Sequence, residues 1–389
     1  MLIIQGRIFI GDGREIEQGY VRIDEKGTIA QVGSMSELRG TDGEEIIEAD
    51  GCLLTPGFID GHSHIGMWED SLGFEGDDGN EDTDPCTPHL RAIDAINPLE
   101  RSFSEALAAG VTSVVTGPGS SNPIAGCITA MKTRGTCVDE MVIRENVGIK
   151  FALGENPKAA FHAKTQSPVT RMAIAALIRE QLQKARRYME DKAEAEADEE
   201  LEMPEFDAKC EALIPLLKRE CRAHFHAHRA DDIYTALRIA REFDLDYLLI
   251  HCTEGHLIAD ELRRAGAGVI TGPMFCTRTK PELSHYTPAT SGVLAAAGVE
   301  VAVCTDHPEL PVQYLALSAG LAAAEGMDRI KALMAITSVP AHLCGIDHRV
   351  GTIRAGLDAD LLIFDRDPFA VGTRPKIVMV NGKICVDVH

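Results

Sequence analysis

Residues 53–64 read LLTPGFIDGHSH, an apolar run that ends in two histidines two positions apart. On an extended backbone, residues i and i+2 point to the same face, so His62 and His64 are expected to lie side by side. Neutral imidazole is a common zinc ligand, and two imidazoles on one face can bind one cation. Taken alone, the pair is better explained as two polar residues that end a strand, so the rest of the chain decides.

The middle of the chain alternates apolar, strand-like runs with amphipathic helical patterns. Helices are expected at 98–109, 231–243, 256–265 and 290–297, and strands at 111–116, 141–153, 247–251, 268–270 and 299–304. Such strand-helix repetition favours parallel strands joined by right-handed crossovers. The length of residues 57–345 fits an α/β fold of the eight-stranded (β/α)8 TIM-type barrel, with insertions.

Both ends of the chain read as short strands broken by turns, such as Gly11 to Gly13 and Asn381-Gly382. Because chain ends usually lie close together in a domain, residues 1–56 and 346–389 are expected to combine in one small β-sandwich domain.

The composition excludes several functional classes. The formal net charge is −22, which argues against a nucleic acid or an anionic membrane as partner. The mean hydropathy is −0.05, and no apolar run approaches the roughly 18 residues of a membrane span. The eleven cysteines follow no disulfide framework and no signal peptide precedes them, so a cytoplasmic protein with reduced thiols is expected.

Two insertions interrupt the strand-helix pattern. Residues 69–84 carry eight acidic residues and no basic ones directly after His64, which predicts either a lid over the barrel mouth or a solvated acidic loop. Residues 170–222 read as a charged helical pair, which predicts a solvent face and a contact within a homo-oligomer.

Further metal-ligand residue types fall at the ends of later strands. His226 and His251 are about one strand-plus-helix unit apart, and Asp306 follows two units later. These residues should therefore converge at the carboxyl ends of the barrel strands. A metal held by histidines gives hydroxide at cellular pH and polarises a carbonyl oxygen, and Asp306 suits the proton shuttle to a leaving nitrogen.

Together with TDHP at 305–308, GTIRAGLDADLLIFD at 351–365 and VNGK at 380–383, this pattern resembles the metal-dependent amidohydrolase superfamily, and most of all its imidazolonepropionase-related branch. The resemblance implies a barrel with a β-sandwich, one or two divalent ions, usually zinc, and hydrolysis of a C–N bond in an amide or cyclic amide of a small polar molecule. It implies that His62, His64, His226 and His251 are metal ligands. The superfamily also contains barrels that lost these ligands and serve as structural or assembly proteins.

The ligand that bridges two metals is open between two residues. Many superfamily members use a carboxylated lysine, which Lys150 would supply, and others use a glutamate, which Glu155 would supply. Glu155 is preferred because it lies at the expected end of the strand and resembles the glutamate ligand of N-acetylglucosamine-6-phosphate deacetylases. If neither residue binds, a single metal held by histidines remains.

Substrate recognition is expected from the loops at the strand ends. His228 lies two residues beyond His226, Asn122 ends the loop after the second strand, and Arg278 and Lys280 follow the seventh. The two cations are suited to a carboxylate, although they are equally well explained as surface charges.

Overall fold

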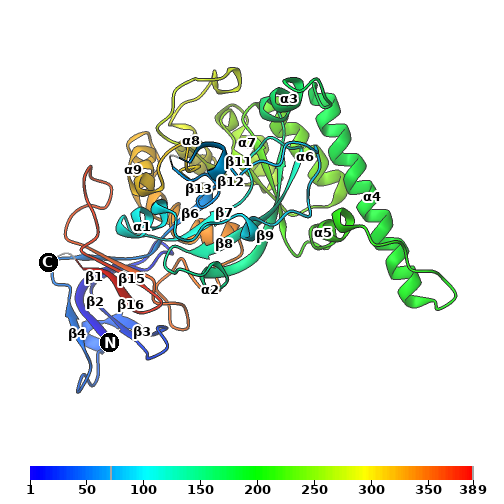
Figure 1. The fold of residues 1–389 in the computed structure, drawn as a ribbon. Coiled ribbons are helices and arrows are strands. Elements are labelled where there is room, and N and C mark those ends of the chain that lie inside the picture. The colour runs from blue at the N-terminus through cyan, green and yellow to red at the C-terminus, as the bar shows by residue number, and fades with distance from the viewer. Residues whose placement is uncertain (71, 388–389) are drawn as a thin grey trace.

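The computed structural model describes residues 1–70 and 72–387, which form two eight-stranded sheets and the helices around them (Figure 1). The first sheet has the strand order β16-β15-β14-β5-β1-β2-β3, with β4 paired to β1. Its strands are β1 (Leu2–Phe9), β2 (Glu15–Ile23), β3 (Ile29–Ser34), β4 (Ile46–Glu48), β5 (Leu53–Pro56), β14 (Leu361–Phe364), β15 (Ile377–Val380) and β16 (Lys383–Asp387). Strands from both chain ends thus share one sheet.

These two chain ends also share a hydrophobic cluster of their own, which includes Ile8, Val21, Leu54, Leu361 and Met379. The hydrogen-bonded pairing joins all eight strands in a single sheet. A β-sandwich, and the domain boundaries at 56/57 and 345/346, therefore stay predictions, and the separate core supports the division.

The second sheet is a nearly closed barrel whose strands follow chain order from β6 to β13. They are β6 (Phe58–Ser63), β7 (Val111–Thr116), β8 (Ile124–Lys132), β9 (Val142–Ala152), β10 (Arg222–Ala227), β11 (Tyr247–His251), β12 (Gly268–Thr271) and β13 (Glu300–Val303). Just beyond β13 and β6, the Asp306 N–H donates to the His62 carbonyl at 3.2 Å, and the His64 N–H donates to the His307 carbonyl at 2.8 Å. These bonds join the first and eighth strands at the barrel mouth.

One part of the barrel departs from the expected parallel arrangement. β7 pairs with β8, and β8 with β9, in antiparallel fashion, and β8 has no counterpart among the strands expected from the sequence. The segment 117–123 between β7 and β8 is too short for the crossover that a parallel pair requires. Residues 111–152 therefore form an antiparallel meander.

The helices lie around the outside of the barrel (Figure 1). They are α1 (Arg101–Ala108), α2 (Val138–Met141), α3 (Glu155–His162), α4 (Arg171–Ala197), α5 (Ala208–Leu217), α6 (Ala230–Phe243), α7 (Ala259–Ala265), α8 (Thr290–Ala297), α9 (Leu315–Ala324), α10 (Arg329–Met334) and α11 (Ser338–Leu343). Ala341 and Leu343 of α11 pack with inward-facing residues such as Ile250 and Ile270, which fills the barrel interior. No described helix combines the length and hydrophobicity that crossing a bilayer requires.

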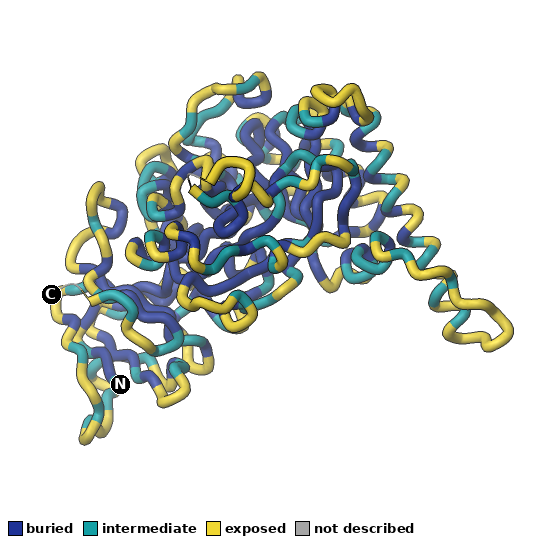
Figure 2. The backbone as a smooth tube through the Cα atoms, viewed as in Figure 1, coloured by how far each residue is buried: buried dark blue, intermediate teal, exposed yellow. Residues whose placement is uncertain are grey.

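The charged helical pair expected at 170–222 is present as α4 and α5, which pack against each other. Figure 2 shows that the far end of this pair projects from the barrel and is exposed, whereas the barrel strands are buried. The solvent face is thus confirmed, and the homo-oligomer contact stays a prediction.

Candidate metal centre and active site

The side chains at the ends of four barrel strands meet at one mouth. His62 lies in β6, with its ring centroid 5.1 Å from that of His64 and 5.6 Å from that of His251, at the end of β11. The His226 ring of β10 lies 4.6 Å from the His251 ring, and Asp306 follows β13. All five residues are buried. The structure therefore places together the four histidines and the acid that the sequence singles out.

Backbone geometry at two of these positions is strained. His251 has φ 68° and Asp306 has φ 56°, both in the left-handed region that residues other than glycine rarely adopt. In β11, Leu248 and Ile250 face the barrel interior, so regular alternation would turn His251 outward. The left-handed turn redirects the imidazole into the mouth, and strain of this kind gathers at functional sites.

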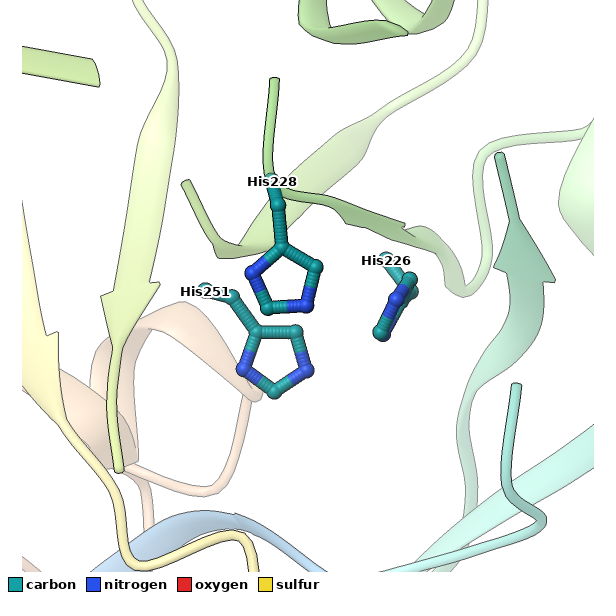
Figure 3. A group of neighbouring side chains, drawn as sticks. All are labelled: His226, His228 and His251. Carbon is teal, nitrogen blue, oxygen red and sulfur yellow. The ribbon is translucent and has the colours of Figure 1, made fainter. Parts of the chain in front are cut away.

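Two groups of three side chains have ligand atoms within 4.8 Å of one another. One group is His62, His251 and Asp306, and the other is His226, His228 and His251. Figure 3 shows the second group, in which the rings of His228 and His251 stack at 4.6 Å and the ring of His226 stands beside them. Because His251 belongs to both groups, the mouth offers enough donors for one or two ions.

The tautomers of two histidines follow from their partners. Nδ1 of His64 lies 2.6 Å from the Gly117 carbonyl, and Nδ1 of His251 lies 2.7 Å from the Gly272 carbonyl. A carbonyl oxygen only accepts, so Nδ1 carries the hydrogen and Nε2 presents a lone pair. Such bonds are typical of histidines that bind metals.

These lone pairs face the carboxylate of Asp306. Nε2 of His64 lies 3.4 Å from Oδ1, and Nε2 of His251 lies 3.9 Å from Oδ2. Acceptors that face one another need a cation between them. Burial lowers the pKa of His251, which opposes an imidazolium there. Burial alone would raise the pKa of Asp306, but positive charge at the surrounding histidines would hold it well below its usual value, so positive charge within the cluster stabilises the carboxylate. The donor set therefore fits a divalent metal ion.

The two candidates for a bridging ligand lie in different surroundings. Lys150 is fully buried, and its Nζ lies 3.1 Å from Nε2 of His62. Burial lowers the pKa of Lys150 to about 8. Glu155, at the first residue of α3, instead accepts the backbone N–H of Glu282 at 3.1 Å. The structure thus brings Lys150, and not Glu155, into contact with a histidine of the cluster.

The four predicted substrate-binding residues also differ in whether they reach the pocket. His228 and Lys280 line a pocket of about 1130 Å³ that opens over Asp306. The side-chain amide of Asn122 instead donates to the Glu81 and Asp84 carbonyls at 2.6 and 2.7 Å. Arg278 donates to the Tyr286 carbonyl at 2.8 Å and is not among the residues that line the pocket. Two of the four residues are therefore in position to meet a ligand.

The acidic insertion lies beside this pocket. Trp68 and Asn80 line the pocket, and the ring of Trp68 lies 4.8 Å from that of His64. The Gly79 carbonyl accepts the Gly119 N–H at 2.8 Å, which adds to the two bonds from Asn122. The described residues of 69–84 are thus tied to the loop after β7, as expected of a lid that rests on the mouth.

Three polar residues of the pocket region had no signal in the sequence. Asn156 and Thr253 line the pocket, and the Glu282 carboxylate is buried 3.6 Å from Nε2 of His228. Thr253 Oγ1 lies 2.7 Å from Nδ1 of His228 and so fixes the orientation of that ring. Thr253 lies on a loop, and Asn156 and Glu282 lie in the first turns of α3 and of the short helix Pro281–Leu283, where no strand periodicity indicates which side chains face inward.

Comparisons with known proteins agree with this geometry. The model of the Amidohydrolase family matches residues 53–385. An amidohydrolase of Thermotoga maritima MSB8 superposes with a TM-score of 0.94 at 36% identity, covering 99% of each chain. Amidohydrolase tasK of Hapsidospora irregularis is 30% identical over 92% of this chain, which spans 39% of that protein's length. Imidazolonepropionase of Bacillus mycoides (strain KBAB4) is 40% identical over 13% of this chain and 12% of its own. The chain belongs to the amidohydrolase family.

Proposed function

We propose that this protein is a metal-dependent hydrolase that cleaves a C–N bond in an amide or cyclic amide of a small polar substrate. The observation that carries the proposal is the convergence of histidine lone pairs on the Asp306 carboxylate, which only a cation reconciles. Family membership supports hydrolysis, and the pocket of about 1130 Å³ suits a small molecule.

We assign the metal ligands to His62, His64, His226 and His251, with zinc as the expected ion. Lys150 is proposed as the further ligand in place of Glu155, because its Nζ lies 3.1 Å from His62 and the Glu155 carboxylate is engaged by backbone. A divalent ion at this position would acidify a coordinated water molecule and polarise the carbonyl oxygen of the substrate.

Asp306 is proposed to move the proton. Its carboxylate lines the pocket and lies 3.3 Å from Nε2 of His62. It is therefore placed to take a proton from the attacking water and hand it to the leaving nitrogen. His228, the ring of which stacks on His251 and faces the pocket, is placed to contact the substrate beside the scissile bond.

The alternative is a non-catalytic structural or assembly protein. A structural or assembly role would not require a complete set of metal ligands. It would also not require the strained backbone at His251 and Asp306. The complete set therefore favours the enzyme.

The test is a screen of N-acyl amino acids, dipeptides and cyclic amides against zinc- and manganese-loaded protein, with metal content measured on the same sample. Metal-dependent release of an amine or opening of a ring is expected, and it should disappear when the metal is removed by a chelator. A protein that binds no metal and hydrolyses nothing in the panel would support the structural alternative.

A further inference from the structure

Two loops of the barrel mouth are joined by a reciprocal clamp. The backbone N–H of Glu155 donates to Oε2 of Glu282 at 3.0 Å, and the backbone N–H of Glu282 donates to Oε2 of Glu155 at 3.1 Å. Glu155 begins α3 after β9, and Glu282 lies in the short helix Pro281–Leu283 after β12. The clamp therefore fixes the loop after the fourth strand against the loop after the seventh.

Lys280 lies on top of this clamp. Its Nζ is 2.8 Å from Oε1 of Glu282 and donates to Oδ1 of Asn156 at 2.9 Å. The Glu282 side chain is 1% exposed, whereas that of Lys280 is 30% exposed and lines the pocket. An ammonium group has three N–H donors, of which Asn156 accepts one while Glu282 Oε1 lies at ion-pair distance, so a donor is left for a ligand.

Neutral donors surround this ammonium group. The Asn156 amide nitrogen donates to Oγ of Ser120 at 2.7 Å and lies 3.4 Å from Nε2 of His226. Ser120 and Ser121 both line the pocket. The group of Lys280, Asn156 and Ser120, which we call the anchor subsite, is therefore adjacent to the histidine cluster, and one substrate can reach both.

The charges select the ligand class. Lys280 is the one Lys or Arg among the described residues that line the pocket, so the lining offers one positive charge, and Glu282, which is not among the lining residues, lies 2.8 Å from it. The other charged residues that line the pocket, Asp306 and Glu309, are acidic. A dianion such as a phosphate monoester would stay uncompensated here. A neutral group on the substrate would gain little from the Lys280–Glu282 ion pair, and holding that ion pair away from water costs desolvation free energy.

We propose that the anchor subsite binds a single carboxylate on the substrate, so that the substrates are amides or cyclic amides that carry a free carboxylate. This inference rests on the proposed function, because it assumes that the scissile bond lies at the histidine cluster. Glu282 and Glu155 are positioning residues that hold Lys280 in place. Under this proposal Glu155 positions Lys280 and is not the metal ligand that the sequence predicts.

Binding can be measured without turnover. Trp68 is the single tryptophan of the chain and lines the pocket, so its fluorescence reports occupancy. The probes are N-acetyl amino acids, each titrated as the free acid and as its carboxamide into zinc-loaded protein. The acid is expected to bind about tenfold more tightly than its carboxamide, because a hydrogen bond to a charged group contributes more than a neutral one.

The Lys280→Met variant should reduce the acid-to-carboxamide ratio of affinities to about one while carboxamide binding changes by less than about twofold, and Lys280→Arg should retain part of the preference. Because Lys280→Met leaves Glu282 buried without its partner, the double variant Lys280→Met with Glu282→Gln is measured beside it. Lys26→Met, an exposed change of the same charge on the turn between β2 and β3, is the matched control and should leave the ratio unchanged.

The outcomes distinguish the two proposals. Equal affinity for acid and carboxamide in the wild type, or an equal loss of both in the Lys280 variants, overturns the anchor subsite whether or not the protein hydrolyses amides. Selective binding of acids that Lys280→Met removes supports the anchor subsite, even where no compound of the panel is hydrolysed and the proposed reaction fails.

Discussion

The replacement His224→Leu should make the protein less sensitive to acid. His224 lies in β10, one inward position below His226, and is fully buried. Neither of its ring nitrogens has a hydrogen-bond partner among the described residues. Burial, and then the charge of Lys150, lower the pKa of His224 to about 3, so the ring is neutral in the folded protein.

The sign of the effect follows from linkage. As the pH falls below about 6.5, the unfolded chain binds a proton at His224 while the folded protein does not, so acid favours unfolding. The free energy of unfolding is therefore unaffected by this group above about pH 6.5, and it decreases as the pH falls from there towards about 3. A leucine binds no proton in either state and removes this loss.

The magnitude follows from the same shift. At about 1.4 kcal/mol per pKa unit, the shift from 6.5 to about 3 corresponds to about 5 kcal/mol at low pH. Between pH 7.5 and pH 5 the expected loss is about 2 kcal/mol. For a chain of 389 residues this is about 2 to 3 °C in Tm.

Thermal unfolding of wild type and variant, each at pH 7.5, 6 and 5, measures the effect. The difference between the two Tm values should change by about 2 to 3 °C in favour of the variant as the pH falls. The exposed His348→Leu is the matched control and should show a profile parallel to wild type. A profile of His224→Leu that is also parallel to wild type would refute the assignment of a buried, neutral ring.

Three further changes test the site. Asp306→Asn should lower kcat by about 100-fold or more with metal content retained, because an amide cannot accept the proton, and full activity in this variant would remove the role. Lys150→Met should lose bound metal and Glu155→Gln should keep it, as measured by elemental analysis, and the reverse pattern would restore Glu155 as ligand. Asn122→Leu removes two hydrogen bonds of about 1 kcal/mol each from the acidic insertion, so deuterium exchange in residues 69–84 should rise, and unchanged exchange would show that other contacts hold it.

Strand alternation explains which ligands the sequence could predict. The H-x-H spacing places His62 and His64 on one face, and the same rule puts His226 on the interior face of β10. His251 follows Ile250, which faces the barrel interior, so alternation points the histidine the wrong way. Its placement depends on a φ of 68°, which tertiary contacts impose and which no local pattern indicates.

The choice between Lys150 and Glu155 shows a second limit. Lys150 is level with His224, two residues below His226, and depth in the strand argued against it. A lysine side chain is longer than a histidine by enough to reach the mouth from that level, as the contact with His62 shows. The position of Cα at the end of a strand is therefore not enough to choose between Lys150 and Glu155, because the position of the functional atom also matters, and the bridging ligand stays a proposal.

Most residues proposed for the reaction and those proposed to anchor the substrate come from different strands of the barrel. The proposed ligands, Lys150 included, and Asp306 lie in or just after the first, fourth, fifth, sixth and eighth strands, β6, β9, β10, β11 and β13. The anchor subsite and the bonds to the acidic insertion come from the segments that follow the second, fourth and seventh strands, with Asn156 in the first turn of α3. Since the fold allows loops to vary while the strands stay fixed, relatives with the same histidines can accept different substrates. Residues in the segments that follow the strands, such as Lys280 and Asn156, are thus a better guide to the substrate than the metal ligands.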